Sequence, residues 1–300
     1  MGKNGLWVIL VTLMMLYSIN KYLIINPVRY DEDNLITVSI ETTSNLQTME
    51  AEAKNDDSRI LKFMTFNIRS ANNKSGSVEL ERIIEEIRET DADIVGLQEV
   101  DRSMPRSGYQ DQAGKIAEQL GYHYYYGDNI NILGMQYGNA LLSKFPILKA
   151  INHNLPKVKL EPRGLIEAEI DIDGSLWHVF VTHLGLNYLE RQKQMSYINN
   201  VISQKDGNIV LLGDFNNYSD SMEMTIMESH LTDSAVKLNC LNQFTFAWKN
   251  DVPNVRIDRI YVSDNDNIFF LHQEAMPSEV SDHSRVVLQI LLNIMREGGI

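Results

Sequence analysis

The chain of 300 residues is 44% hydrophobic and 22% charged, an ordinary globular composition that is long enough to bury one large core. Its single cysteine, Cys240, excludes an intramolecular disulfide and a cysteine-built metal site. The formal net charge of −13 excludes the strong basic excess of most non-specific nucleic-acid binders, so nucleic acid is a disfavoured partner.

The first element of the chain is an apolar segment. Residues 6–17 form an apolar-rich run, and a second apolar patch covers residues 22–25. Together they reach the ~20 residues that a bilayer requires, and no small-residue cleavage site follows. We therefore expect residues 1–25 to be an uncleaved signal anchor, with a cleaved signal peptide as the alternative.

Charges on both sides of this segment predict its orientation. Lys3 precedes the apolar run, and acidic residues 31–33 follow it, which predicts an amino terminus in the cytoplasm and an extracellular remainder. The protein is then a single-pass protein of the cell membrane or, if the segment is cleaved, a secreted one. Residues 26–58 are polar and predict a flexible linker, residues 59–292 predict one domain, and residues 293–300 are a tail.

Within the domain, short β-rich runs alternate with a few helical patterns, which is typical of sheets covered by helices. The predicted strands are residues 61–66, 94–97, 140–143, 165–170, 177–182, 209–212, 257–262 and 286–291. Three apolar stripes at helical spacing predict helices that face a core. The stripes are Leu80, Ile83, Ile84 and Ile87; Ala113, Ile116, Ala117 and Leu120; and Leu189, Met195, Ile198 and Ile202.

Polar residues that can perform chemistry lie next to the ends of these predicted strands. Strand ends in a layered fold bring residues that are distant in sequence to one rim, where ligands usually bind. We therefore expect one site built from these residues. They are Asn67, Glu99, His183, Asp214, Asn216, Asp282 and His283.

Five short motifs occur in order along the domain. They are TFNIR at 65–69, QEVD at 98–101, GDFN at 213–216, IDRI at 257–260 and SDH at 281–283. Together they resemble the endonuclease/exonuclease/phosphatase superfamily, which includes deoxyribonuclease I, apurinic-site endonucleases, bacterial sphingomyelinases and inositol polyphosphate 5-phosphatases. The motifs at 138–143 and 182–184 extend the resemblance toward members with a histidine after the middle strand. The resemblance implies an α/β fold, a deoxyribonuclease I-like four-layer sandwich of two packed mixed β-sheets flanked by helices.

The resemblance also implies a metal site. Hydrolysis of a phosphate ester requires neutralised phosphoryl oxygens, an aligned water and help for the leaving oxygen. Glu99 is the expected metal ligand, with Asn67 and Asp282 as further members of the site. A hard cation such as Mg²⁺ prefers carboxylate oxygen, so Mg²⁺ is the expected cofactor and Mn²⁺ the alternative.

The remaining motif residues have expected catalytic roles. Asp214 would orient or deprotonate the attacking water, and Asn216 would hold a phosphoryl oxygen. His283 would pair with Asp258, which fixes its tautomer and raises its basicity. His183 would be a second phosphate contact or the acid on the leaving-group side. Each of these residues also has a structural interpretation, since turns and strand ends use the same residue types.

Two further residues are candidates for substrate binding. Arg163 precedes a predicted strand and is an expected phosphate clamp, and Asn139 is expected to contact the substrate or His183. The motifs define the reaction but not the leaving group, because loops determine substrate choice in such folds. We expect a monomeric extracytoplasmic phosphodiesterase that acts on a lipid headgroup, a glycolipid or a small phosphodiester. A secreted nuclease and a catalytically inactive member that binds phosphorylated ligands are the alternatives.

Overall fold

The computed structural model describes residues 58–158, 161–218, 227, 230–247 and 252–293. The expected anchor at 1–25 and all of the expected linker except Ser58 lie outside the described residues, as do residues 294–300. Among the helices in the described ranges, none is long and apolar enough to cross a membrane.

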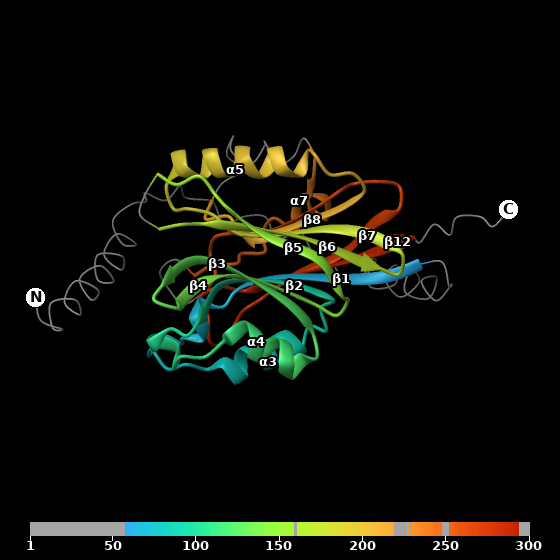
Figure 1. Cartoon of the computed structure of the whole chain (residues 1–300). Coiled ribbons are helices and arrows are strands. Elements are labelled where there is room, and N and C mark those ends of the chain that lie inside the picture. The colour runs from blue at the N-terminus through green and yellow to red at the C-terminus, as the bar shows by residue number, and fades with distance from the viewer. Residues whose placement is uncertain (1–57, 159–160, 219–226, 228–229, 248–251, 294–300) are drawn as a thin grey trace, which may run out of the picture. The chain divides into compact units, whose positions relative to one another are not determined.

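Two six-stranded mixed sheets pack face to face, and helices cover both outer faces (Figure 1). The first sheet has the order β11-β12-β1-β2-β4-β3, and the second has the order β5-β6-β7-β8-β10-β9. In the first sheet the strands are β1 (Ser58–Asn67), β2 (Ile94–Arg102), β3 (His123–Ile132), β4 (Met135–Ser143), β11 (Ile268–Met276) and β12 (Arg285–Asn293). In the second they are β5 (Ile147–Asn154), β6 (Gly164–Ile172), β7 (Ser175–His183), β8 (Asn208–Asp214), β9 (Thr232–Asp233) and β10 (Asp258–Val262). This confirms the predicted four-layer α/β sandwich.

The central strands are apolar on both faces because each sheet lies between two layers. Successive side chains of a strand point to opposite faces, so Phe63 enters the core between the sheets while Met64 and Phe66 pack under the helices. Phe63 of β1 meets Trp177 of β7 across the sheets, with 5.1 Å between their ring centroids. Continuous apolar runs were therefore a sufficient signal for these strands.

Three α-helices supply most of the outer layers. Their bounds are α3 (Leu80–Arg88), α4 (Gln112–Leu120) and α5 (Tyr188–Ile202), with the short α7 (Ser234–Lys237) and the 3-10 turns η1 (Arg69–Ala71) and η2 (Pro105–Ser107). Helices α3 and α4 cover the first sheet, and α5 covers the second (Figure 1). The predicted stripe on α5 needs one correction. Leu189 is 59% exposed, whereas Met195, Ile198 and Ile202 are buried, because six residues before Met195 is not a helical repeat and places Leu189 off the buried face.

Four described strands were absent from the prediction, and all four lie at sheet edges. They are β3, β5, β9 and β11. An edge strand has one neighbour and partial exposure, so its sequence needs no continuous apolar run. The burial of β5 illustrates this, since no residue of that strand is fully buried.

Candidate active site

The second sheet presents three polar side chains in a row. His183 ends β7, Asp214 ends β8 and Asp258 begins β10. In the strand register, Asp214 lies opposite His183 on one side and opposite Asp258 on the other. Gly213 allows this alignment, because a Cβ there would lie 2.5 Å from the carbonyl oxygen of Thr182. Regular strand pairing thus brings together residues that are 75 positions apart.

The first sheet contributes its side chains from irregular backbone. Asn67 ends β1, and Glu99 lies in the bulge that shifts the register of β2 between Leu97 and Val100. Glu99 has a φ of 56°, a left-handed conformation that non-glycine residues rarely adopt; in the second sheet only Asn216, just beyond β8, shares it among the predicted site residues, with a φ of 49°. Such strained positions concentrate at functional sites, and a bulge redirects a side chain out of the normal alternation.

Asn67 joins the carboxylates of the two sheets. Its Nδ2 donates to Glu99 Oε1 at 3.1 Å and to Asp214 Oδ2 at 3.0 Å. Its Oδ1 accepts from the backbone N–H of Arg69 at 3.0 Å, which fixes the orientation of the amide. Asn67 therefore holds Glu99 and Asp214 close together at the rim.

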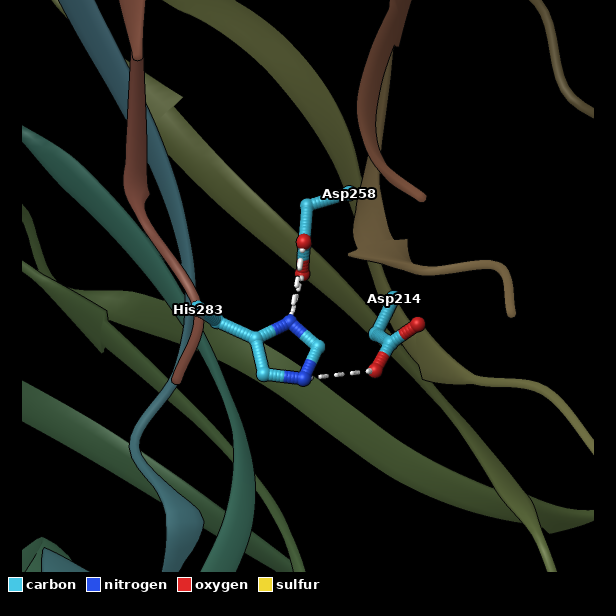
Figure 2. A group of neighbouring side chains, drawn as sticks. All are labelled: Asp214, Asp258 and His283. Carbon is cyan, nitrogen blue, oxygen red and sulfur yellow. Dashed lines mark hydrogen bonds and ion pairs between the residues drawn. The ribbon is translucent and has the colours of Figure 1, made fainter. Parts of the chain in front are cut away.

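His283 pairs with Asp258 and faces Asp214 (Figure 2). Its Nδ1 lies 3.0 Å and 3.2 Å from the two carboxylate oxygens of Asp258, and its Nε2 lies 3.8 Å from Asp214 Oδ2. The ring of Phe246 packs on the imidazole, with 4.7 Å between the centroids. Burial lowers the pKa of His283, but the charge and hydrogen bond of Asp258, together with Asp214, raise that pKa to about 10. His283 therefore carries a proton on Nδ1 directed at Asp258.

For Asp214, burial is the influence that decides the direction of the pKa shift. Burial, followed by the negative charge of Asp258, raises the pKa of Asp214 to about 6. His283 and the hydrogen bonds from Asn67 and the backbone N–H of Asn216 lower it, but they do not outweigh burial. In this state Asp214 can exchange a proton close to neutral pH, as a general base requires.

His183 lies on the other side of Asp214. Arg163 NH1 lies 3.1 Å from His183 Nδ1, and because a guanidinium only donates, Nδ1 accepts and the proton is on Nε2. Nε2 lies 3.4 Å from Asp214 Oδ2. The side-chain Nδ2 of Asn216 donates to the carbonyl of Leu184 at 2.9 Å; it also lies 3.0 Å from His183 Nε2, a contact between two donors and not a hydrogen bond in this tautomer. In the structure Arg163, the predicted phosphate clamp, orients the imidazole.

Two predicted site residues, Asn139 and Asp282, bond partners other than the site residues described above. Asn139 is fully buried and donates to the carbonyl of Gly164 at 3.2 Å; a bond from Asn139 to His183 is not among the interactions of the described residues. Asp282 is half-buried, and its Oδ2 lies 3.8 Å from Arg69 Nε. The structure thus brings Asp282 to the basic side chain that follows Asn67.

The donor set fits a divalent cation. Asp214, Asp258 and His283 each offer a ligand atom within 4.8 Å of the others, although His283 can serve as a ligand only when its imidazole is neutral. Glu99 adds a further carboxylate, which Asn67 links to Asp214 by donating to both. Asp282 precedes His283 in the sequence. Hard cations take such oxygen ligands, whereas the described cluster holds no thiol.

Sequence reasoning missed two residues that support the histidine pair. Thr245 Oγ1 accepts from the backbone N–H groups of Ile257 and Asp258, both at 3.0 Å, and so fixes the start of β10. Phe246 covers His283. Neither lies in a motif, and a Thr between two Phe residues is an ordinary strand pattern, so only the tertiary structure reveals their roles.

The fold and the site together define a class, the metal-dependent hydrolases of phosphate esters with a deoxyribonuclease I-like fold. The sequence profile of the endonuclease/exonuclease/phosphatase family matches residues 64–283. The chain therefore belongs to this family.

Two curated relatives are similar in sequence. Protein cwh43 of Schizosaccharomyces pombe is 32% identical over 134 residues, which are 44% of this chain but only 14% of cwh43. The uncharacterised protein YbhP of Escherichia coli is 28% identical over 225 residues, which are 69% of this chain and 86% of YbhP. The match thus spans most of YbhP and a small part of cwh43.

Solved structures share the fold. An endonuclease/exonuclease/phosphatase protein of Beutenbergia cavernae has a TM-score of 0.65 at 24% identity, covering 78% of this chain and 72% of its own. The mannosyl-6-phosphatase Bt3783 of Bacteroides thetaiotaomicron has a TM-score of 0.64 at 20% identity, covering 77% and 99%. TDP2 of D. rerio, complexed with a single-strand DNA product, has a TM-score of 0.61 at 16% identity, covering 77% and 98%. At these identities the likeness concerns the fold alone.

Proposed function

We propose that this protein is a Mg²⁺-dependent phosphodiesterase that acts outside the cytoplasm on a lipid headgroup, a glycolipid or another small phosphodiester. The observation that carries the proposal is the amide bridge of Asn67, which joins Glu99 to Asp214 between two oriented histidines. A carboxylate for a cation, a base for water and two imidazoles are the groups that phosphate-ester hydrolysis needs.

Each group has a place in an in-line attack. Asp214 takes a proton from the attacking water, since its carboxylate is held by Asn67 and by the backbone of Asn216. His283, protonated and oriented by Asp258, neutralises developing charge on a phosphoryl oxygen from its Nε2–H. His183 donates from its Nε2 on the opposite side of Asp214. Mg²⁺ at Glu99, when bound, supplies Lewis-acid polarisation of the phosphoryl group.

A cavity of about 350 Å³ beside His283 supports a small polar substrate. Its wall carries amide, hydroxyl and charged groups from two loops, and its only apolar members among the described residues are Ala247 and two prolines. The polar members include Asn73, Lys74, Ser278 and Glu279. Such a lining can hydrogen-bond a sugar or polyol, and its described residues include no aromatic platform for a base.

Hydrolysis of bis-p-nitrophenyl phosphate tests the reaction. We expect turnover with Mg²⁺ or Mn²⁺, loss of at least about 10²-fold in EDTA, and recovery when the metal is restored, because charge neutralisation requires the cation. Absence of turnover with either metal would contradict the enzymatic proposal and favour the inactive phospholigand-binding alternative.

A substrate panel tests the leaving group. We expect glycerophosphodiesters and sugar phosphodiesters to give a higher kcat/KM than oligonucleotides, and Lys74→Ala to raise KM for the preferred substrate by roughly threefold through loss of a cavity contact. Lys115→Ala, an exposed lysine outside this cavity, is the matched control. A preference for oligonucleotides would instead support the secreted nuclease.

The location is a separate part of the proposal. Its support is the apolar segment at 1–25 with Lys3 before it and acidic residues 31–33 after it. Protease added to cells without an outer barrier should cut between residues 26 and 58. Protection of this stretch until the cells are lysed would contradict an extracytoplasmic domain.

A further inference from the structure

A buried carboxylate on α3 contacts the loop that leads into β12. Glu86 is fully buried, and its Oε2 accepts from the hydroxyl of Ser278 at 2.7 Å. Its Oε1 accepts from the backbone N–H of Glu279 at 2.8 Å. A buried carboxylate is costly unless it is hydrogen-bonded, and both hydrogen bonds of the Glu86 carboxylate go to this loop, while Arg82 Nε on the same helix lies 4.0 Å from Oε1.

The hydrogen bonds continue from Ser278 to the active site. Ser278 Oγ accepts from the backbone N–H groups of Val280 at 3.0 Å and Ser281 at 2.9 Å. Ser281 Oγ then accepts from the N–H of His283 at 3.1 Å and donates to the carbonyl of Asn67 at 2.7 Å. Both ends of this last link are candidate catalytic or metal-site residues.

The direction of each bond follows from the donor count. Two N–H groups occupy the lone pairs of Ser278 Oγ, so its proton points to Glu86. Both oxygens of Glu86 therefore act as acceptors, one for a hydroxyl and one for an N–H. A carboxylate meets this demand, whereas the amide of a glutamine offers one acceptor and turns a donor toward the other partner.

Arg285 closes the same loop from its other side. Its NH1 donates to the carbonyl of Glu86 at 2.7 Å and to Glu89 Oε2 at 3.1 Å, and its NH2 donates to the carbonyl of Pro277 at 3.2 Å. Helix α3 and its C-terminal Glu89 thus bind the loop at Ser278 and Glu279 and also at Arg285, two residues after His283.

We propose that Glu86 is a positioning residue of the active site, which acts through Ser278 and Ser281 to hold His283 and Asn67 at a fixed separation. Glu86 does not contact the reacting groups, so its effect is on their placement. The readout by turnover rests on the proposed hydrolase function, whereas the placement of the loop has a readout of its own. The rival interpretation is that Glu86 only stabilises the packing of α3.

Glu86→Gln tests the proposal, because it retains the volume and removes one acceptor. We expect kcat on bis-p-nitrophenyl phosphate to fall roughly 10–100-fold with KM changed less than about twofold, as for other residues that orient an active site from outside. Hydrogen–deuterium exchange of the backbone at residues 278–284 should become faster than in the wild type, since the N–H groups of this loop lose their fixed partners.

Two control variants separate positioning from stability. Glu85→Gln makes the same chemical change one residue earlier on α3, where the side chain is half-exposed and pairs with Arg88, and it should leave kcat and the exchange of the loop unchanged. Ile83→Val weakens the core under α3, so it lowers Tm and should leave kcat unchanged well below that temperature.

The outcomes decide between the interpretations. A kcat within about twofold of the wild type in Glu86→Gln, or a loss that Ile83→Val reproduces at equal Tm, would overturn the proposal. If the wild type hydrolyses no phosphate ester, the proposed function fails by itself. The hydrogen–deuterium exchange of residues 278–284 then still decides, since unchanged exchange in Glu86→Gln overturns the positioning role of Glu86 and accelerated exchange supports it.

Discussion

The two sheets build their halves of the site in different ways. In the second sheet His183, Asp214 and Asp258 stand on regular strand ends, opposite one another in the register. In the first sheet Glu99 needs a bulge, and the turn after Asn67 places Arg69, Ser70 and Ala71 in left-handed conformations with φ between 49° and 55°. Regular pairing positions most of the second sheet's side chains, with Asn216 beyond β8 as the exception, and irregular backbone positions those of the first sheet, including His283 in the loop before β12.

This difference determines what each half requires from its surroundings. A strand end is positioned by the ladder of backbone hydrogen bonds, so few additional side chains are needed. An irregular turn lacks that ladder and needs side-chain partners for its backbone groups. Gln112 supplies one for the turn after β1, and Glu86 supplies others for the loop before β12. Substitution of Gln112 or Glu86 should therefore disturb the site residues of the first sheet more than those of the second.

Removing the charge of Glu99, which lies in the irregular half, should have the largest effect on activity. Glu99→Gln keeps the volume and removes the charge that is expected to hold the cation, so we expect kcat/KM to fall at least about 10³-fold with Tm nearly unchanged. Steady-state kinetics at saturating Mg²⁺ measures this. Retention of more than about a tenth of the wild-type activity would show that Glu99 is not the metal ligand.

The pair of His283 and Asp258 tests the contact between the two halves, since Asp258 begins β10 whereas His283 lies in the irregular loop before β12. Asp258→Asn and His283→Ala should each lower kcat by about 10²-fold, and the double variant should be little worse than His283→Ala alone. Non-additivity follows because Asp258 has no imidazole to orient once His283 is removed. Fully additive losses across the double-mutant cycle would mean that the two residues act separately.

Asp258→Asn should also change how activity and stability depend on pH. The pKa of His283 is raised from 6.5 to about 10, so its protonated form stabilises the fold below pH 6.5, and this contribution is lost as the pH rises through 10. Asp258→Asn removes the negative partner and lowers the pKa. The alkaline limb of the pH–rate profile and the alkaline loss of stability should both move to lower pH, and unmoved limbs would contradict the pairing.

The sequence predicts the regular half better than the irregular one. The apolar runs that end at His183 and Asp214 show both the strands and the residues that they direct to the rim. The edge strands β3 and β5 were missed because their exposed faces remove the apolar signal. Motif order compensates for Glu99, since QEVD marks the position although no local pattern indicates a bulge there.

The supporting residues could not have been predicted. Glu86 lies beside an apolar stripe on α3, as a solvent-exposed glutamate would, and its partner Ser278 is 192 positions away. Gln112 looks like an ordinary first residue of a helix. Long-range partners of this kind depend on how α3 and α4 sit on the sheet, which local sequence patterns do not determine.

Gln112→Ala should have the smallest of these effects and sharpens the comparison most directly. Gln112 is fully buried, its Oε1 accepts from the N–H of Asp101 at 2.9 Å, and its Nε2 donates to the carbonyl of Ser70 at 2.6 Å. It therefore ties the strand beyond the Glu99 bulge to the left-handed turn beyond Asn67. Alanine leaves both backbone groups without this partner, which should lower the free energy of unfolding by about 2 kcal/mol.

The effect of Gln112→Ala on activity should be confined to Asn67 and Glu99, because both hydrogen bonds of Gln112 go to the backbone just beyond these two residues. We expect the Mg²⁺ concentration for half-maximal activity to rise roughly threefold, because Glu99 and Asn67 lose rigidity, while the pH limb of His283 stays in place. Gln119→Ala is the matched control, since Gln119 lies on the same helix and its exposed side chain bonds only Glu81 among the described residues. An equal shift of the pH limb would mean that Gln112 also positions His283, so that the metal-site residues and the histidine pair are not positioned independently.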